Sequence, residues 1–307
     1  MHIIITGGSG LIGRALTTSL LHDQHRVTVL SRHPSKVADR LPAQTNIVGW
    51  DARTAKGWGH QVEAADAIVN LAGESIAAWP WTAAKRRRIR QSRVDIGQAV
   101  VEAFTAAKKR PRVLVQASGV GYYGPRGEDI VHEDATSGKD FLARVAVDWE
   151  AATAPVEALG VRRVVIRTGA VLSREGGALP RLSLPFRLFV GGPLGNGRQR
   201  VPWIHIADEI AAIRFLLTHE EAEGPFNLTA PHPPTNAVFS KVLGRVMRRP
   251  AWVRVPAFAV RLVLGEMSTI VLRGQRAEPE RLLSLGYRFK YPALETALKS
   301  LLKPESP

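Results

Sequence analysis

Short, nearly continuous apolar runs alternate with longer amphipathic stretches along the first two thirds of the chain. The stretch that follows the first run repeats apolar residues at helical spacing, at Leu11, Ile12, Ala15, Leu16 and Leu20. A nearly continuous apolar run is typical of a parallel strand that is buried on both faces. Such runs lie at 3–5, 26–30, 46–48, 67–73, 113–118 and 164–169. Strands that alternate with helices predict an α/β fold with a doubly wound parallel sheet.

The rest of the chain predicts a second, smaller lobe. Segment 176–197 is rich in glycine and proline and has apolar residues suited to a lid or loop. A strand at 226–229 is expected to rejoin the sheet. Prolines bound the amphipathic segments that follow it, at 239–247, 258–264, 280–285 and 294–302. We therefore predict a sheet domain over 1–170, rejoined by about 206–230, and a mainly helical substrate-covering lobe over 171–205 and 231–307.

A glycine-rich turn connects the first predicted strand to the first predicted helix. Residues 7–13 read GGSGLIG, which places glycine at Gly7, Gly10 and Gly13. Glycine is needed where the chain turns tightly, approaches a pyrophosphate closely and packs a helix against a strand. The N–H groups at the start of the helix then face the phosphates. The alternative is a glycine-rich turn without a ligand, but the strand–turn–helix context favours a Rossmann-type dinucleotide site.

The end of the second predicted strand indicates which dinucleotide binds. An NAD site places Asp or Glu here, whereas a site for a 2′-phosphate offers Arg. This strand ends in Ser31 and Arg32, with Lys36 following and with no acidic residue at the tip. Arg32 can form a bidentate, charge-assisted pair with a phosphate. We therefore predict NADP(H) over NAD(H); the alternative is that Arg32 is an ordinary solvated loop residue.

One arginine on a long basic helix differs from its neighbours. Arg93 falls in register with an apolar stripe at Ile89, Ile96, Val100 and Phe104, so it is expected to point toward the sheet. A buried charge needs a partner. A cofactor phosphate or a carboxylate on an adjacent loop would provide one, and we favour the cofactor.

Composition narrows the class of protein. The chain has 307 residues, 45% of them hydrophobic, and no cysteine, which excludes disulfides, thiolate metal ligands and a cysteine nucleophile. No apolar run approaches the roughly 18 residues of a membrane span, and the sequence begins with a strand instead of a signal peptide. We expect a cytoplasmic protein that binds no membrane.

The formal net charge of +15 raises the question of nucleic-acid binding. The arginines are spread along the chain, and no aromatic stacking platform accompanies the cluster at 85–93. We therefore expect no nucleic-acid partner.

Several motifs resemble the extended short-chain dehydrogenase/reductase superfamily, namely residues 6–13, 70–74 and Ser118 with 121–124. More narrowly, the chain resembles the nucleoside-diphosphate-sugar epimerase-like proteins of the YfcH group. That narrower resemblance rests on residues 167–169, 171–172, 185–187, 191–193, 203–206, 274–276 and 285–287, and it extends over essentially the whole chain. The later motifs include the C-terminal module of that group.

The resemblance implies a Rossmann-type NADP(H) domain and a homodimer that pairs through two long helices. It also implies that the cofactor contacts Gly7, Gly10, Leu11, Ile12, Ser31, Arg32, Leu71, Ala72, Arg93 and Val171. Arg32 and Arg93 follow independently from the reasoning above.

The proton-transfer residues of the superfamily are absent. Typical members use a Tyr-x-x-x-Lys pair in which the Tyr is the general acid/base. Alignment on Glu150 places Ala146 at the lysine and Leu142 at the tyrosine, and no Tyr-x-x-x-Lys occurs nearby. The usual serine position is occupied by Gly119, with Ser118 one residue before it.

Other residues are candidates for the missing chemistry. Tyr122 or Tyr123, just beyond the fifth strand, is a candidate acid with Ser118 beside it, and Glu74 is a second candidate. The alternatives are that Tyr123 is a packing residue and Ser118 a strand-end hydrogen-bonding residue. His205 alternates with apolar residues and is interpreted as a structural histidine, so no metal site is predicted.

Two functions remain open. The first is an NADP(H)-dependent oxidoreductase or epimerase-like enzyme that acts on a small polar or phosphorylated molecule. Arginines in the second half would meet an anionic or nucleotide-linked substrate, namely Arg187, Arg198, Arg200 and Arg276. The second function is a non-catalytic NADP(H) sensor or binding module, which the missing Tyr and Lys favour.

Overall fold

A seven-stranded parallel sheet in the order β11-β7-β5-β4-β1-β2-β3 forms the centre of the protein. The structure is a computed structural model that describes residues 1–302. The strands are β1 (His2–Thr6), β2 (Arg26–Ser31), β3 (Asn46–Gly49), β4 (Ala67–Asn70), β5 (Val113–Gly119), β7 (Arg162–Thr168) and β11 (Gly224–Leu228). This order reverses direction between β1 and β4, which is where doubly wound sheets bind their ligands.

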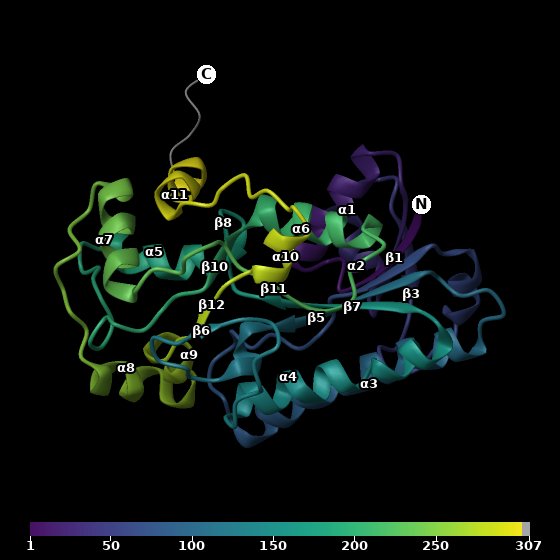
Figure 1. Cartoon of the computed structure of the whole chain (residues 1–307), viewed down its shortest axis with the longest axis horizontal. Coiled ribbons are helices and arrows are strands. Elements are labelled where there is room, and N and C mark those ends of the chain that lie inside the picture. Colours follow the sequence, from purple (N-terminus) through teal and green to yellow (C-terminus); the bar gives the residue numbers. More distant parts are fainter. Residues whose placement is uncertain (303–307) are drawn as a thin grey trace.

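Helices cover both faces of the sheet because successive strand residues point to opposite sides. In β1, Ile3 and Ile5 pack on one side and Ile4 on the other, in two separate apolar clusters. Helices α1 (Leu11–His22) and α6 (Ile206–Thr218) lie on one face, and α3 (Ala83–Ala106) and α4 (Phe141–Ala151) on the other (Figure 1). The predicted doubly wound fold is confirmed.

A second lobe lies beyond the carboxyl ends of the strands, at the left of Figure 1. It contains the three-stranded sheet β10-β8-β9 and its own apolar cluster, to which Phe186, Phe239 and Leu298 belong. Its strands are β8 (Ala170–Ser173), β9 (Gly176–Gly177) and β10 (Trp203–His205). Its helices are α5 (Leu179–Arg187), α7 (Asn236–Met247), α8 (Ala257–Leu264), α9 (Ser268–Leu272) and α11 (Leu294–Leu302).

The C-terminal segment returns to the edge of the main sheet. Strand β12 (Arg276–Ala277) pairs with β6 (Ile130–Val131), and α10 (Glu280–Ser284) follows it. Thr229 Oγ1 donates to the Ala277 carbonyl at 3.0 Å, and Asn227 Nδ2 donates to the Glu278 carbonyl at 3.0 Å. The smaller lobe is therefore hydrogen-bonded directly to the strand β11 and its continuation.

Most of the predicted elements are present, with shifted ends. The strand expected at 67–73 ends at Asn70, and the one expected at 226–229 is β11, which pairs with β7. Segment 176–197 is not only a loop, because it contains the nine-residue helix α5, which has Pro180 in its first turn. A proline there costs no helical hydrogen bond.

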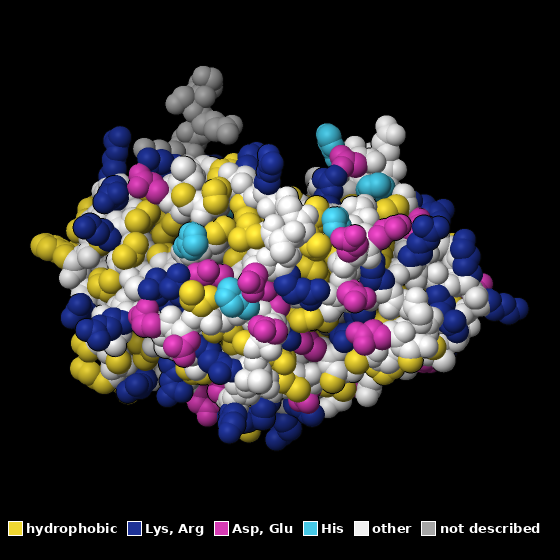
Figure 2. All heavy atoms as spheres, in the orientation of Figure 1, with side chains coloured by type: hydrophobic (Ala, Val, Ile, Leu, Met, Phe, Trp, Pro, Cys, Tyr) yellow, Lys and Arg dark blue, Asp and Glu magenta, His cyan; other side chains and the backbone are white. Residues whose placement is uncertain are grey.

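The remaining helices of the described residues are short, namely α2 (Pro34–Val37) and the 3₁₀ helices at Ala38–Arg40, Gly59–Ala64, Val120–Tyr123, Ala154–Leu159 and Gly265–Met267. Among residues 1–302, no helix has the length and hydrophobicity needed to cross a membrane. On the face in Figure 2, Lys and Arg side chains are scattered over the surface and mixed with Asp and Glu.

Candidate functional site

The glycine-rich turn packs so closely against its surroundings that a side chain would not fit at Gly7 or Gly13. Gly7 has a φ of +70°, and a Cβ there would lie 2.9 Å from the Ala72 nitrogen. A Cβ on Gly13 would lie 2.3 Å from the Gly7 carbonyl oxygen and 2.6 Å from Gly8 Cα. Gly10 caps α1 in an extended conformation, without a side-chain hydrogen bond. The first N–H groups of α1 thus lack partners within the helix and are available to an anion.

A row of polar side chains holds the neighbouring turn against these glycines. Thr6 Oγ1 donates to Asn70 Oδ1 at 2.5 Å, and Asn70 Nδ2 donates to Gln116 Oε1 at 2.8 Å. Thr6 Oγ1 also accepts from the Ala72 nitrogen at 3.2 Å. The carboxyl ends of β1, β4 and β5 are thereby tied together, and Leu71 and Ala72 are placed beside Gly7.

Ser31 and Arg32 lie at the carboxyl end of β2, the strand that pairs with β1. Ser31 is buried, and its Oγ accepts from the His33 nitrogen at 3.2 Å. Arg32 is exposed, and its charge contributes to lowering the pKa of Glu74, after the larger effect of Lys85. An exposed cation one strand away from the glycine turn is suitably placed for a 2′-phosphate.

Arg93 of α3 is buried beside the turn that follows β4, as the apolar stripe predicts, with 8% of its surface exposed. Its Nη1 donates to the carbonyls of Glu74 at 3.0 Å and Ile89 at 2.8 Å. Its guanidinium also lies 4.5 Å from the ring centre of Trp149. Burial lowers the pKa of Arg93 to about 10, with Glu74 acting in the opposite direction. Since its partners are mostly neutral, Arg93 retains capacity to bind an anion.

A cavity of about 490 Å³ extends from this region into the second lobe. At the sheet end its wall includes Ile12, Arg93 and Val171, together with Ser118 at the end of β5. Gly177 of β9 packs against both Leu11 and Val171. A Cβ on Gly177 would lie 2.4 Å from the Val171 carbonyl oxygen and 3.1 Å from the Leu11 side chain. The structure thus brings together residues from distant parts of the sequence that the resemblance associates with the cofactor.

Ser118 belongs to a buried ionic network with Glu150 and Arg167, which lie too far apart in the sequence for their spacing to predict the contact. Its Oγ donates to Glu150 Oε1 at 2.7 Å. Arg167 pairs with both oxygens of Glu150 at 2.9 Å, with only 5% and 13% of the two side chains exposed. Because the Ser118 proton is directed to Glu150, Ser118 presents a lone pair to the cavity.

The two tyrosines are placed differently from Ser118. Tyr123 has no exposed surface, and its hydroxyl donates to Asn227 Oδ1 at 2.7 Å and accepts from Arg167 at 3.0 Å. Burial raises the pKa of Tyr123 to about 12. The ring of Tyr122 lies 3.5 Å from the Arg167 guanidinium carbon. Neither ring is part of the described cavity wall, so this geometry favours the packing interpretation over the acid.

Apolar side chains occupy the positions where the superfamily has its Tyr and Lys. Leu142 and Ala146 both line the cavity, on α4. The other candidate, Glu74, forms an ion pair with Lys85 at 2.5 Å, and this contact lowers the pKa of Glu74. Glu74 is therefore ionised at neutral pH and does not serve as an acid there.

A second hydroxyl in the cavity wall contacts a buried carboxyl group. Thr168 lines the cavity, and its Oγ1 donates to Glu209 Oε1 at 2.8 Å. Glu209 has no exposed surface, and its Oε2 has no hydrogen-bond partner among the described residues. Burial raises the pKa of Glu209 to about 8, so it is neutral at pH 7. The spacing of residues 168 and 209 gave no indication of this contact.

The raised pKa of Glu209 makes the free energy of unfolding depend on pH. Its pKa is about 8 in the fold and 4.5 when unperturbed, so its contribution is fully present below pH 4.5 and is lost as pH rises to about 8. We expect the free energy of unfolding of the wild type, relative to Glu209→Gln, to fall by roughly 1 kcal/mol per pH unit in that window. Denaturant titrations between pH 5 and about 8 would measure this difference.

The matched control is Glu221→Gln, since Glu221 lies at the surface with 85% of its side chain exposed. That variant should follow the wild-type pH profile. A Glu209→Gln profile parallel to the wild type would contradict the assignment of a neutral carboxyl.

Other candidate residues have structural partners. His205 accepts from the Ala207 nitrogen at 3.0 Å and so caps α6, and burial lowers its pKa to about 4, consistent with a structural histidine. Of the four arginines expected to meet an anionic substrate, Arg200 lines the cavity and pairs with Glu128 at 2.8 Å. Arg276 pairs with Glu278, while Arg187 and Arg198 are not in this cavity wall.

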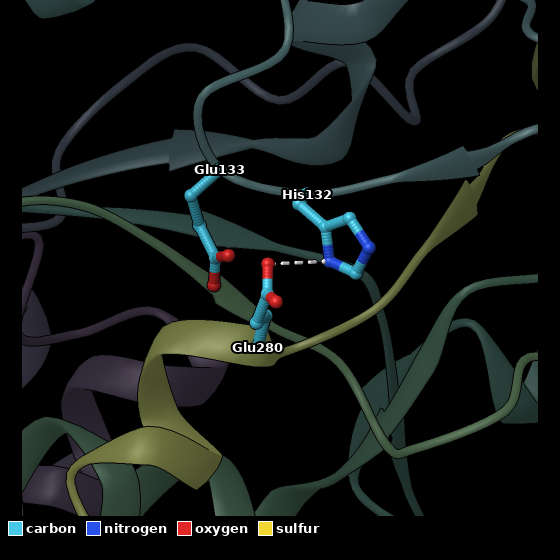
Figure 3. Close-up of side chains that lie close together, drawn as sticks. All are labelled: His132, Glu133 and Glu280. Carbon is cyan, nitrogen blue, oxygen red and sulfur yellow. Dashed lines mark ion pairs between the residues drawn. The ribbon is translucent and has the colours of Figure 1, made fainter.

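Figure 3 shows the group His132, Glu133 and Glu280, whose ligand atoms lie within 4.8 Å of one another. His132 pairs with Glu280 at 2.9 Å. Glu133 is buried and accepts from the backbone nitrogens of Asn227 at 3.0 Å and Arg281 at 3.3 Å. Since its carboxylate already holds β11 and α10 together, we assign this group a structural role.

Comparisons with known proteins agree with this architecture. The model of the NAD dependent epimerase/dehydratase family matches residues 3–229, and a domain of unknown function (DUF1731) matches residues 255–301. An epimerase family protein of Staphylococcus aureus strain N315 is 39% identical over 305 residues, covering 98% of each chain. One from Staphylococcus epidermidis is 38% identical over 301 residues, again covering 98% of each.

Two solved structures are similar in sequence as well as fold. Human epimerase family protein SDR39U1, crystallised with NADPH, is 35% identical with a TM-score of 0.89, covering 99% of this chain and all of that one. A nucleoside-diphosphate sugar epimerase from Corynebacterium glutamicum is 32% identical with a TM-score of 0.79, covering 98% of this chain and 58% of that one. UDP-glucuronic acid 4-epimerase from Bacillus cereus, at 16% identity and a TM-score of 0.78, shares the fold.

Proposed function

Since this chain belongs to the NAD dependent epimerase/dehydratase family, we propose that it is an NADP(H)-dependent oxidoreductase or epimerase-like enzyme acting on a small molecule. The observation that carries this proposal is a single cavity that reaches from Ile12, at the start of α1, to Ser118, at the end of β5. A helix start binds pyrophosphate, and the carboxyl ends of parallel strands carry the reacting groups. The NADPH in the crystal structure of human SDR39U1 supports the same choice of cofactor.

In this proposal each cofactor residue has a defined role. The turn with Gly7, Gly10 and Gly13 admits the pyrophosphate, and Arg32 with Ser31 binds the 2′-phosphate. Ile12 and Val171 line the cavity beside this turn, and Arg93 supplies a buried positive charge there. Leu71 and Ala72 lie against Gly7, and Leu11 lies against Gly177. When bound, the nicotinamide supplies or accepts a hydride. Ser118 then orients a substrate hydroxyl by accepting its hydrogen bond, because its own proton is directed to Glu150.

Replacement of Arg32 tests the proposed preference for NADP(H) over NAD(H). We expect Arg32→Ala to weaken NADPH binding by about 10- to 100-fold, because a charge-assisted hydrogen bond contributes about 1.5–3 kcal/mol. NADH binding should change little, since NADH lacks the 2′-phosphate. Calorimetric titration of cofactor-stripped protein with both nucleotides would measure this.

The control for that titration is Arg254→Ala, which removes the same charge from an exposed position in the C-terminal half. It should leave both affinities unchanged. Equal binding of NADPH and NADH by the wild type would refute the NADP(H) preference.

A second candidate function is a non-catalytic NADP(H) sensor. The apolar Leu142 and Ala146 favour it, because they stand where the superfamily has its proton-transfer pair. Tight NADPH binding without turnover of any carbonyl compound would favour the sensor, whereas oxidation of bound NADPH would favour the enzyme.

A further inference from the structure

The part of the cavity that extends away from the glycine turn is mainly apolar. Its wall comes from α4, α5, α7, α9 and the segment after β5. Its apolar members include Leu142, Ala146, Trp149, Leu182, Phe239 and Ile270. Such a wall favours an apolar ligand, because burying an unpaired charge against it is costly.

Two of the four charged residues in the described wall already have partners, and a third, Arg93, lies at the sheet end of the cavity. Asp140 Oδ1 accepts from the Ala143 nitrogen at 2.9 Å and caps α4. Arg200 pairs with Glu128 at 2.8 Å and also donates to the Pro233 carbonyl at 3.2 Å. Arg273 lies in the wall as well, but is exposed. A nucleoside diphosphate carries two phosphate groups, and away from the sheet end the described wall offers them Arg200, which is already paired, and the exposed Arg273.

Three polar side chains in the wall use their donors within the protein and are left with acceptor atoms, namely Ser118, Thr168 and Gln199. The protons of Ser118 and Thr168 are directed to Glu150 and Glu209. Gln199 uses its Nε2 to donate to the carbonyls of Leu194 at 3.1 Å and Val271 at 2.8 Å. Its Oε1 is buried and has no hydrogen-bond partner among residues 1–302. A buried acceptor without a partner is costly unless a ligand supplies a donor.

We propose that this cavity binds a compact, uncharged ring alcohol of one or two rings, and not a nucleotide sugar. The apolar wall contacts the ring system, and its hydroxyl donates to one of the wall acceptors, Ser118 Oγ or Gln199 Oε1. The volume of about 490 Å³ limits the size, since a nicotinamide ring would occupy part of it. The idea that this alcohol reacts with NADP(H) rests on the proposed function. The binding test of the cavity does not depend on it.

The test compares three probes by calorimetry, with and without NADP⁺. The probes are 1-tetralol, its methyl ether 1-methoxytetralin, which cannot donate a hydrogen bond, and UDP-glucose. We expect 1-tetralol to bind at least about tenfold more tightly than either of the others, which corresponds to one hydrogen bond or more.

Two variants link binding to this cavity. Ala146→Glu places a carboxylate in the apolar wall and should weaken 1-tetralol binding by at least about tenfold. Ala151→Glu makes the same change at an exposed position at the end of the same helix and should not. If Ala146→Glu fails to fold, Leu142→Gln replaces it, with circular dichroism to verify the fold.

The outcomes are distinct. Tighter binding of UDP-glucose than of 1-tetralol overturns the proposal, as does the absence of 1-tetralol binding. Equal affinities for the alcohol and the ether overturn the assignment of acceptors. Failure of NADP(H) to bind would instead refute the proposed function and leave the probe comparison interpretable.

Discussion

Gly13→Ala should weaken NADPH binding by at least about 100-fold, the largest effect we expect from a single methyl group in this protein. The added Cβ would lie 2.3 Å from the Gly7 carbonyl oxygen and 2.6 Å from Gly8 Cα, and both are backbone atoms. A flexible side chain could move aside, but backbone can yield only if the whole turn shifts. That shift would disturb the surface on which the pyrophosphate is expected to lie. Calorimetric titration with NADPH would measure the loss.

The matched control is Gly49→Ala at the end of β3, where the nearest atom would be Pro34 Cγ at an ordinary contact distance of 3.6 Å. This variant should bind NADPH as the wild type does. Wild-type affinity in Gly13→Ala, in a protein with an unchanged circular dichroism spectrum, would contradict the assigned role of the turn.

Glu150→Gln should destabilise the fold by about 3–5 kcal/mol, the typical effect of breaking a buried ion pair from one side. The substitution leaves the buried Arg167 guanidinium without its countercharge, and the ion pair with Glu150 raises the pKa of Arg167. It also replaces the carboxylate that accepts the Ser118 proton. Chemical denaturation of wild type and variant would measure the difference in free energy of unfolding.

The half-exposed pair of Glu157 and Arg163 provides the comparison. Glu157 lies 2.7 Å from Arg163, and 52% of the Glu157 side chain is exposed, compared with 12% of that of Arg163. We expect Glu157→Gln to cost at most about 1 kcal/mol, because solvent reaches the Glu157 carboxylate and screens its charge. Similar losses in the two variants would show that burial does not determine the strength of the Glu150 pair.

The fold was largely predictable because its signals are local. A strand buried on both faces is apolar at nearly every position, as in β1 and β4, and the glycine turn has a fixed spacing. Arg93 could be predicted to be buried because it shares a helical stripe with Ile89 and Ile96. In each case the residues that decide the structure are neighbours in the sequence.

The polar interior of the site could not be predicted in this way. Glu150 and Arg167 come from a helix and a strand that meet only in the tertiary structure, and no periodicity relates them. The same holds for Thr168 and Glu209. Tyr123 was a candidate acid because of its place after β5, but its burial against Asn227 depends on the return of the chain at β11.

The return of the C-terminal segment to the sheet edge has a consequence for how the protein unfolds. The buried carboxylate of Glu133 binds the Arg281 nitrogen, and that of Asp208 binds the nitrogens of Lys290 and Tyr291 at 2.7 and 2.9 Å. Without residues 255–301, Glu133 and Asp208, both in the part matched by the first family model, would lose these backbone partners. We therefore expect the two matched regions to unfold together in a single cooperative transition.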